Sequence, residues 1–346
     1  MTKKRFARFS IGFGCLALTL SAVAAQGGQA GSVAETVRTP DGKPDLGGVW
    51  DFRTLTPLQR PEEQVEAMLT DEQAAEVEAN AVQRAVDADR PSEIRTELLP
   101  VGGNVGGYNN FWFDRGAGVV ADRRTSLITE PQNGRLPVIK DGSKLQETTD
   151  AVSGVSDRPV RFRVGGIGMD GPEDRGLAER CLLGFNTGPP IVPGGYNQNI
   201  QVFQTPDHLV IFNEMVHDAR IVPLDGRARP SSALRQWNGN SRGYWDGDTL
   251  VVETRNFSDN TASFGPTVRS AIGSGLTMQL TERFRRLNEN TLIYEFTVDD
   301  STSFAAPFTA VVPMTRGEQP LFEYACHEGN YGMLNLLSGA RANETE

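Results

Sequence analysis

The sequence predicts a mainly β protein built around an antiparallel β-barrel, with an N-terminal helix and long covering loops. After residue 196, short strand-like runs alternate with turn signals such as Pro206-Asp207, Asp225-Gly226 and Asp246-Gly247. This pattern is typical of an antiparallel barrel or sandwich. The chain also lacks strand–helix–strand alternation, which disfavours a parallel α/β fold.

One long helix is expected near the N-terminus, over residues 71–88. Thr70 and Gln73 form a capping box that marks its start, and alanines and valines recur behind it at helical spacing. Pro91 follows the helix and ends it. Before the helix, the run 47–52 is expected to form a first short strand.

The remaining regular structure is expected to be β. Asn133-Gly134 indicates a hairpin turn between strands at 125–129 and 136–139. A long irregular stretch over 141–195 contains a short helical piece near 173–182. The strands expected after this stretch span 200–204, 209–215, 219–222, 243–245, 250–256, 278–287, 292–298, 308–314 and 321–326.

These strands are expected to be polar on one face and apolar on the other; over 292–298, Leu292, Tyr294 and Phe296 share the apolar face and Glu295 points away from it. In the strand over 278–287, Leu280, Glu282 and Phe284 occupy alternate positions and therefore share a face. A closed barrel, with an architecture resembling that of lipocalins, can hold one small ligand inside. Charged residues that point inward would make a polar binding site. The alternative is that they face water.

Composition and charge restrict the partners. The chain has 346 residues, of which 38% are hydrophobic and 23% charged, so we expect a globular protein with a single domain over 45–341. Its formal net charge of −10 argues against nucleic acid and anionic membranes as partners. A small-molecule ligand or substrate is expected instead, with no cofactor, and the sequence does not indicate an oligomeric state.

The N-terminus resembles a secretory signal. Four basic residues precede an apolar run over 9–23, which is shorter than the ~20 residues of a transmembrane span. Val23-Ala24-Ala25 resembles a cleavage site. We therefore expect cleavage after Ala25, a flexible leader over 26–44, and a periplasmic or secreted protein without stable membrane insertion.

Two cysteines, Cys181 and Cys326, remain after removal of the signal. Two thiols in an oxidising compartment usually pair, so a disulfide is expected. The alternative is two buried free thiols. Neither cysteine lies in a Cys-x-x-Cys motif, so thiol redox catalysis is not expected.

The densest polar cluster surrounds His217. This residue adjoins Asp218 and follows Glu214 by three positions, and His327 similarly adjoins Glu328. A neighbouring carboxylate orients an imidazole and favours its charged form, which suits general acid/base catalysis. We therefore expect these five residues to be catalytic, within one cavity, in a lyase, isomerase or hydrolase. The candidate substrate-binding residues are Arg220, Arg242, Tyr196, Asn197 and Tyr331.

Other chemistry remains open for the same residues. His217, Asp218 and His327 could bind a single metal ion, although no metal is the preferred prediction. Gly239-Asn240-Ser241-Arg242-Gly243 matches the nucleophile elbow of serine hydrolases. However, that elbow leads into a helix, and here a strand-like run follows it.

Two interpretations without catalysis also remain. The barrel could carry a hydrophobic ligand in a lumen lined by Leu292, Tyr294 and Phe296. Alternatively, the polar clusters could be structural and join strand ends to loops by salt bridges. Convergence of His217, His327 and an arginine around one cavity would favour the enzyme.

Six motifs together resemble a family of exported, largely uncharacterised bacterial proteins frequent in acidobacteria and sphingomonads. They are PDLGGVW (44–50), RTSLI (124–128), ERC (179–181), QTPDH to EMVHD (204–218), SRGYWDGDTLVV (241–252) and YACHEGNY (324–331). The resemblance covers nearly the whole mature chain. It implies one integrated unit and supports pairing of Cys181 with Cys326, but it implies no particular activity.

Overall fold

The computed structural model describes residues 37–90, 96, 113–114, 116, 118–143, 145–147 and 160–344. These residues all belong to one compact unit, Glu35–Glu346. The expected signal, its cleavage site, the first part of the leader and the glycines at 102–107 lie outside the described residues.

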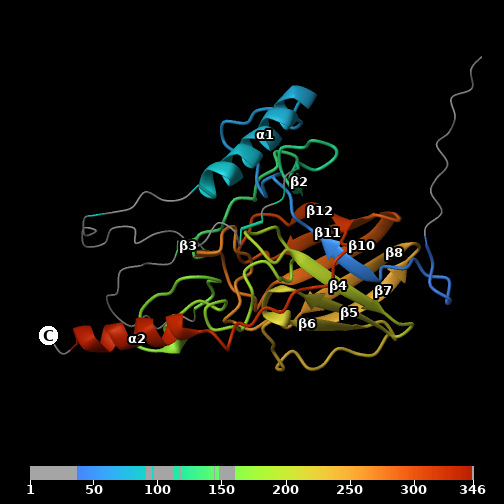
Figure 1. The fold of residues 1–346 in the computed structure, drawn as a ribbon. Coiled ribbons are helices and arrows are strands. Elements are labelled where there is room, and N and C mark those ends of the chain that lie inside the picture. The colour runs from blue at the N-terminus through green and yellow to red at the C-terminus, as the bar shows by residue number, and fades with distance from the viewer. Residues whose placement is uncertain are drawn as a thin grey trace, which may run out of the picture. The chain divides into compact units, whose positions relative to one another are not determined.

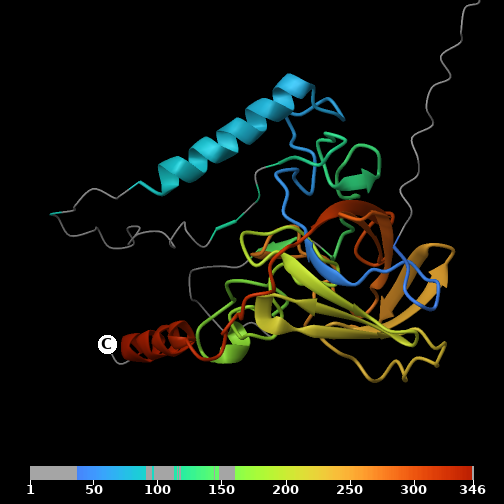
Figure 2. The same cartoon turned by 45° about the vertical axis from the view of Figure 1, so that its right-hand side comes forward.

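A nearly closed antiparallel β-barrel forms the body of this unit (Figures 1 and 2). Its strands are β1 (Gly48–Asp51), β2 (Ile128–Glu130), β4 (Asn199–Gln204), β5 (His208–Asn213), β6 (Ala219–Pro223), β7 (Asn240–Asp246), β8 (Thr249–Arg255), β10 (Gln279–Asn288), β11 (Thr291–Asp299) and β12 (Phe308–Arg316). They pair in the order β6-β5-β4-β1-β12-β11-β10-β8-β7, with β2 added to β12. The end strands β6 and β7 contact each other, which confirms the predicted barrel.

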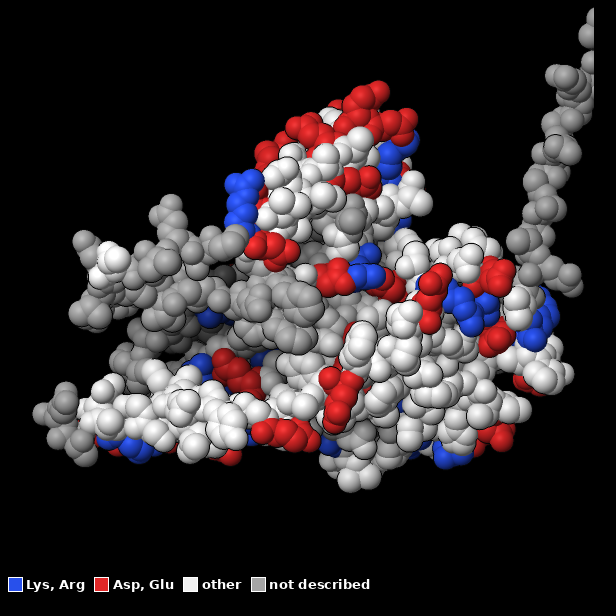
Figure 3. All heavy atoms as spheres, in the orientation of Figure 1, with Lys and Arg blue, Asp and Glu red and all other residues white. Residues whose placement is uncertain are grey.

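Two helices and a small second sheet accompany the barrel. Helix α1 (Asp71–Ala88) has the expected bounds, and Thr70 and Gln73 form both hydrogen bonds of the predicted capping box. Acidic side chains gather along α1 in Figure 3. The second sheet pairs β3 (Gln146–Glu147) with β9 (Ser270–Ala271). Among the described helices, none has the length and apolar character to cross a bilayer.

The second helix, α2 (Tyr331–Asn343), has no counterpart among the predicted elements. Asn330 caps it, because the Asn330 side chain accepts a hydrogen bond from the Met333 N–H at 3.2 Å. In the irregular stretch, the expected helical piece at 173–182 is reduced to a 3₁₀ turn at Pro172–Asp174.

The barrel interior is filled by large side chains. Trp50, Phe284, Tyr294, Phe296 and Phe308 are all fully buried. The rings of Phe284, Tyr294, Phe296 and Phe308 contact one another in sequence, with centroids 5.0 Å apart for Phe284–Tyr294, 5.8 Å for Tyr294–Phe296 and 6.5 Å for Phe296–Phe308. Alternation along β10, β11 and β12 turns these residues inward. The aromatic side chains considered for a ligand-carrying lumen therefore pack against each other.

The prediction of a strand at 321–326 is wrong, because this segment is irregular. Its backbone bonds to a side chain rather than to a neighbouring strand. The Phe322 N–H donates to a carboxylate oxygen of Glu214 at 3.4 Å. Strand β5 also ends two residues earlier than expected, because Glu214 adopts a helical conformation, with φ of −62° and ψ of −47°, and starts a 3₁₀ turn over Met215–His217, which an extended strand cannot contain.

The hairpin predicted around Asn133-Gly134 is also only partly correct. Gly134 turns with φ of 70°, a conformation that glycine adopts without strain. However, the expected return strand at 136–139 does not form, and β2 pairs with β12 instead, with Ile128 opposite Ala310. At the other end of the domain, residues 37–44 form a turn in which Arg38 pairs with Asp248 at 2.8 Å.

Candidate functional site

A buried ion pair crosses the barrel interior between β6 and β10. Both terminal nitrogens of Arg220 bond the carboxylate of Glu282, at 2.5 and 2.8 Å. The Tyr294 hydroxyl donates to the same carboxylate at 2.9 Å and accepts from the Ile191 N–H at 3.0 Å. Burial works to lower the pKa of Arg220, but the charge and hydrogen bonds of Glu282 outweigh it and raise that pKa. Burial and the Glu282 charge raise the pKa of Tyr294 well above its ordinary value.

Asp218 lies just before β6, two residues from Arg220, and its carboxyl is half-buried. The Asn238 side-chain amide donates a hydrogen bond to it. Burial raises the pKa of Asp218, although Asn238, Arg220 and Arg163 oppose the rise. A raised pKa moves a carboxyl closer to the pH range in which general acid/base catalysis operates.

Arg163 faces Asp218 from the irregular segment that precedes β4. Among the described residues, its guanidinium makes one hydrogen bond, a long one of 3.4 Å to the Gly184 carbonyl. Burial lowers the pKa of Arg163 to about 10, and the charge of Asp218 partly offsets this effect. Gly184 has no space for a side chain, since a Cβ would come within 2.6 Å of Met215 Cγ. The Gly184 carbonyl, which accepts the hydrogen bond from Arg163, is therefore packed against Met215 in the turn that follows β5.

The turn after β5 carries three of the predicted catalytic residues. Glu214 is buried and accepts a hydrogen bond from the Asn199 side chain at 2.8 Å. His217 is exposed, with Nδ1 3.1 Å from the Tyr324 carbonyl oxygen. A carbonyl can only accept, so Nδ1 carries the proton in this arrangement and Nε2 remains available as a base.

Backbone strain is concentrated near this turn. Of six non-glycine residues with positive φ in the described part of the chain, four are Cys181, Asn197, Val216 and His217. Cys181 and Val216 share a small apolar cluster against which Tyr196 packs. Such conformations cost about 1–3 kcal/mol each and cluster at functional sites. Val216, a β-branched residue, is the least expected of them.

The predicted disulfide between Cys181 and Cys326 is present, with an S–S distance of 1.94 Å. It holds the segment after β12 against the turn at 214–217, because Tyr324 and Cys326 pack on the cluster of Cys181, Met215 and Val216. Asn330 adds a hydrogen bond to the Glu179 carbonyl at 2.8 Å.

The second predicted pair, His327 and Glu328, follows this disulfide directly and is exposed. The backbone segments of the two histidines therefore lie close together, since His217 contacts Tyr324. Neither histidine lines the cavities described below. Their placement in one shared cavity stays a prediction.

The predicted substrate-binding residues have different surroundings. Arg220 is occupied by Glu282 inside the barrel. Arg242 donates to the carbonyls of Arg227 and Ala228 at 3.1 and 2.8 Å and so holds the loop before β7. Tyr196 packs edge-on against Phe185 at 5.1 Å. The Asn197 carbonyl accepts from Asn186 at 3.1 Å, and Tyr331 is 70% exposed.

Two of the alternatives can be judged from the geometry. Ser241 lies within β7, is buried, and its hydroxyl is 2.8 Å from that of Thr254. It therefore lies in a strand rather than in the strand-to-helix elbow that a serine nucleophile requires. In the part of the chain that the structure describes, no three His, Cys, Asp or Glu residues form a group that could hold a metal ion. The grouping of His217, Asp218 and His327 as metal ligands is therefore not present.

Arg163 lines the smaller of two adjoining cavities. The smaller, here called the Arg163 cavity, has about 30 Å³ and is lined by Arg161, Arg163, Phe185 and neighbouring loop residues. The larger, called the adjoining pocket, has about 340 Å³ and shares Val192 and Gly265 with it. The adjoining pocket is near the lower end of the size range of small-molecule sites.

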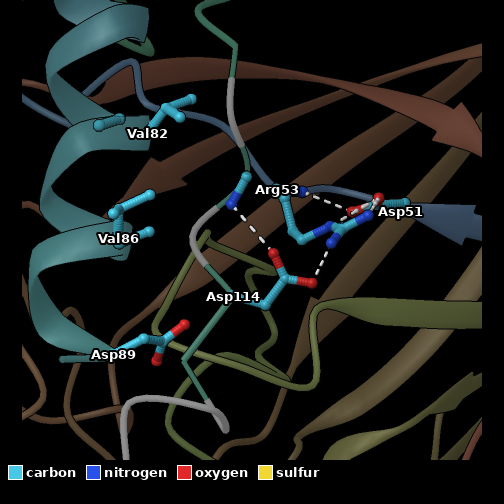
Figure 4. Close-up of a pocket in the computed structure, with 9 residues that line it drawn as sticks. Asp51, Arg53, Val82, Val86, Asp89 and Asp114 are labelled. Atoms are coloured by element: carbon cyan, nitrogen blue, oxygen red, sulfur yellow. Dashed lines mark hydrogen bonds and ion pairs between the residues drawn. The ribbon is translucent and has the colours of Figure 1, made fainter. Parts of the chain in front are cut away.

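A third cavity, of about 480 Å³, lies between α1 and the end of β1 (Figure 4). Arg53 there donates to Asp51 at 2.7 Å and also pairs with Asp114. Val82 and Val86 of α1 form the apolar side. Arg53 is thus neutralised by its own partners.

Arg163 and Asn238 were not among the predicted site residues. Arg163 lies 55 positions before Asp218 in the chain, in a segment without periodicity, and so no local pattern connects them. Asn238 is 20 positions from Asp218 and belongs to a loop rich in polar residues. The fold alone brings these side chains to Asp218.

Comparison of the chain with known proteins identified no related protein. No protein-family model matches the chain, and no curated protein or solved structure matches it either. The function therefore has to be argued from the residues around Asp218 and Arg163.

Proposed function

We propose that this protein is an exported enzyme that acts on a small organic molecule by general acid/base catalysis. Asp218 is the proton-transfer group, and His217 on the same turn exchanges protons with solvent. The proposal rests on the environment of the Asp218 carboxyl. This group is half-buried and accepts a hydrogen bond from Asn238, and burial raises its pKa. Lyase, isomerase and hydrolase reactions all use such a group.

Two further observations support this location. Val216 and His217, both with positive φ, directly precede Asp218, and strained backbone of this kind is typical of functional sites. Arg163 interacts with the carboxyl through space and is suited to stabilise negative charge that develops on a reacting oxygen, whereas Arg220 is already paired with Glu282. The alternative of a carrier for a hydrophobic ligand is less well supported, because aromatic rings fill the barrel interior.

Export is part of the proposal. It is supported by the signal-like N-terminal sequence and by the disulfide, since disulfides persist in oxidising compartments. Intact-mass measurement of the periplasmic fraction should find the protein cleaved after Ala25. Full-length protein in the cytoplasm would contradict export.

Activity can be tested without knowing the reaction. The protein is incubated in D₂O with a panel of small organic acids, esters and lactones, and NMR detects deuterium incorporation or conversion. We expect Asp218→Asn to reduce the rate on any active compound by at least ~100-fold, as loss of a general acid or base does. The matched control Asp225→Asn changes an exposed turn carboxylate and should leave the rate unchanged. Full activity of Asp218→Asn would refute the role of Asp218.

The same substitution should stabilise the protein at neutral pH. The folded state holds the Asp218 proton more tightly than the unfolded chain, so the ionised carboxylate costs stability once the pH exceeds its ordinary pKa of 3.8. Each tenfold difference in proton affinity corresponds to about 1.4 kcal/mol. The melting temperature of Asp218→Asn should therefore exceed that of the wild type at pH 7.5, and the two should converge below pH 3.8.

Asp225→Asn again provides the control, because hydrogen bonds from Arg227 lower the pKa of Asp225 to about 2. Its neutralisation should not raise the melting temperature at pH 7.5. An Asp218→Asn protein that is less stable than the wild type at this pH would show that the ionised carboxylate is stabilising.

A further inference from the structure

We propose that the Arg163 cavity binds the carboxylate of a small amphipathic acid and that the adjoining pocket binds its apolar body. This inference rests on the proposed function only in taking that acid to be the substrate. It is carried by the charges that line the two cavities, by the unused donors of Arg163 and by the size of each space.

The charges that line the two cavities are all positive. Among the described lining residues, the ionisable ones are Arg84, Arg161 and Arg163, and none is acidic. This is unusual in a chain whose formal net charge is −10. The cavity between α1 and β1 shows the opposite, since Asp51, Asp89 and Asp114 line it together with a single arginine.

The arginines of the smaller cavity differ in how far they are already satisfied. Arg161 donates to both the carbonyl and the carboxylate of Asp259, each at 2.7 Å. Arg163 has only the long contact with Gly184 among the described residues, and no carboxylate forms an ion pair with it there. A guanidinium carries five N–H donors, and a carboxylate can accept two of them in a fork. Arg163 is therefore the group left to receive an anion.

The sizes of the two spaces suit a carboxylate with an apolar substituent. The Arg163 cavity, at 30 Å³, has room for about two water-sized atoms, which corresponds to the two oxygens of a carboxylate. Leu55, Pro57, Leu127 and Pro266 line the adjoining pocket. Val192 and Gly265 line both spaces, so the two lie next to each other, and we place one molecule across them. Asp218 interacts electrostatically with Arg163 but lines neither cavity.

Binding is tested by calorimetry with phenylacetate, its neutral analogue phenylacetamide, and phenyl phosphate. A hydrogen-bonded charge pair in a partly buried site is worth a tenfold or greater change in affinity. We therefore expect the wild-type protein to bind phenylacetate at least ~10-fold more tightly than phenylacetamide. Arg163→Gln should abolish this difference. Arg283→Gln, which changes an arginine on the outer face of β10 that lines neither cavity, should preserve it.

A second variant tests the site independently in case Arg163→Gln does not fold. Val192→Trp leaves Arg163 in place and fills the shared wall, so it should weaken phenylacetate binding as well. Three results would overturn the inference: no binding of phenylacetate by the wild type, binding that Arg163→Gln leaves intact in a folded protein, or tighter binding of phenyl phosphate than of phenylacetate.

The experiment separates this inference from the proposed function. Asp218→Asn keeps Arg163 and should still bind phenylacetate in an Arg163-dependent manner. Arg163-dependent binding without any Asp218-dependent turnover would support the carboxylate site and count against the enzyme. Asp218-dependent turnover that Arg163→Gln leaves unchanged would support the enzyme and count against the carboxylate site.

Discussion

Arg220→Met and Glu282→Leu should each lower the free energy of unfolding by about 3–5 kcal/mol, because each leaves an uncompensated charge in the barrel interior. Glu282 has no exposed surface and Arg220 only 7%, so water cannot solvate the remaining partner. Loss of Glu282 also removes the acceptor of the Tyr294 hydroxyl, which is itself fully buried. Chemical denaturation followed by fluorescence measures both changes.

The double variant Arg220→Met/Glu282→Leu should lose much less than the sum of the two single losses, because two apolar side chains replace the pair. The pair Arg283–Glu295 provides the control. It bridges β10 and β11 on the outer face at 3.7 Å, with both side chains substantially exposed, and such pairs contribute about 0–1 kcal/mol. Strictly additive losses at 220 and 282 would show that the buried pair is not coupled.

Removal of the Cys181–Cys326 disulfide should produce the second large effect. The bridge closes a loop with a sequence separation of 145 residues, for which the chain-entropy model gives an upper value of about 5 kcal/mol. Measured losses are commonly nearer 2–4 kcal/mol. We expect Cys181→Ala/Cys326→Ala to lower the melting temperature and to release the segment around Tyr324 from the turn at 214–217.

Reducing agent should lower the melting temperature of the wild type to a similar extent and leave that of the double variant unchanged. Hydrogen exchange should show faster exchange in residues 322–330 of the double variant. Equal melting temperatures for the wild type with and without reductant would contradict a stabilising role of the bridge.

Much of the fold could be predicted because its determinants are local. The capping box of Thr70 and Gln73 fixes the start of α1, and period-two alternation marks the long strands. The same alternation correctly places Glu282 on the face of Leu280 and Phe284, and the structure shows that this face is inward. Helix α2 also has a local signal in the sequence, because Asn330 is a favourable N-cap residue and caps the helix in the structure.

The errors concern segments whose partners are distant in sequence. The run at 321–326 alternates like a strand, yet Glu214 and the disulfide hold it in irregular form. Likewise, nothing near Arg220 indicates that Glu282 occupies its guanidinium, 62 positions away. Asp218 was recognised from its neighbour His217, but Arg163 and Asn238 come to it only through the closed barrel and the loops packed upon it.

The most direct test of the account is an NMR titration of the Asp218 carboxyl carbon in the folded protein, assigned by its absence in Asp218→Asn. We expect a pKa above the ordinary value of 3.8, rising further in Arg163→Gln because that substitution removes a cation which stabilises the carboxylate. A pKa at or below 3.8, or one that Arg163→Gln leaves unchanged, would contradict the claim that burial and Arg163 together set the proton affinity of Asp218.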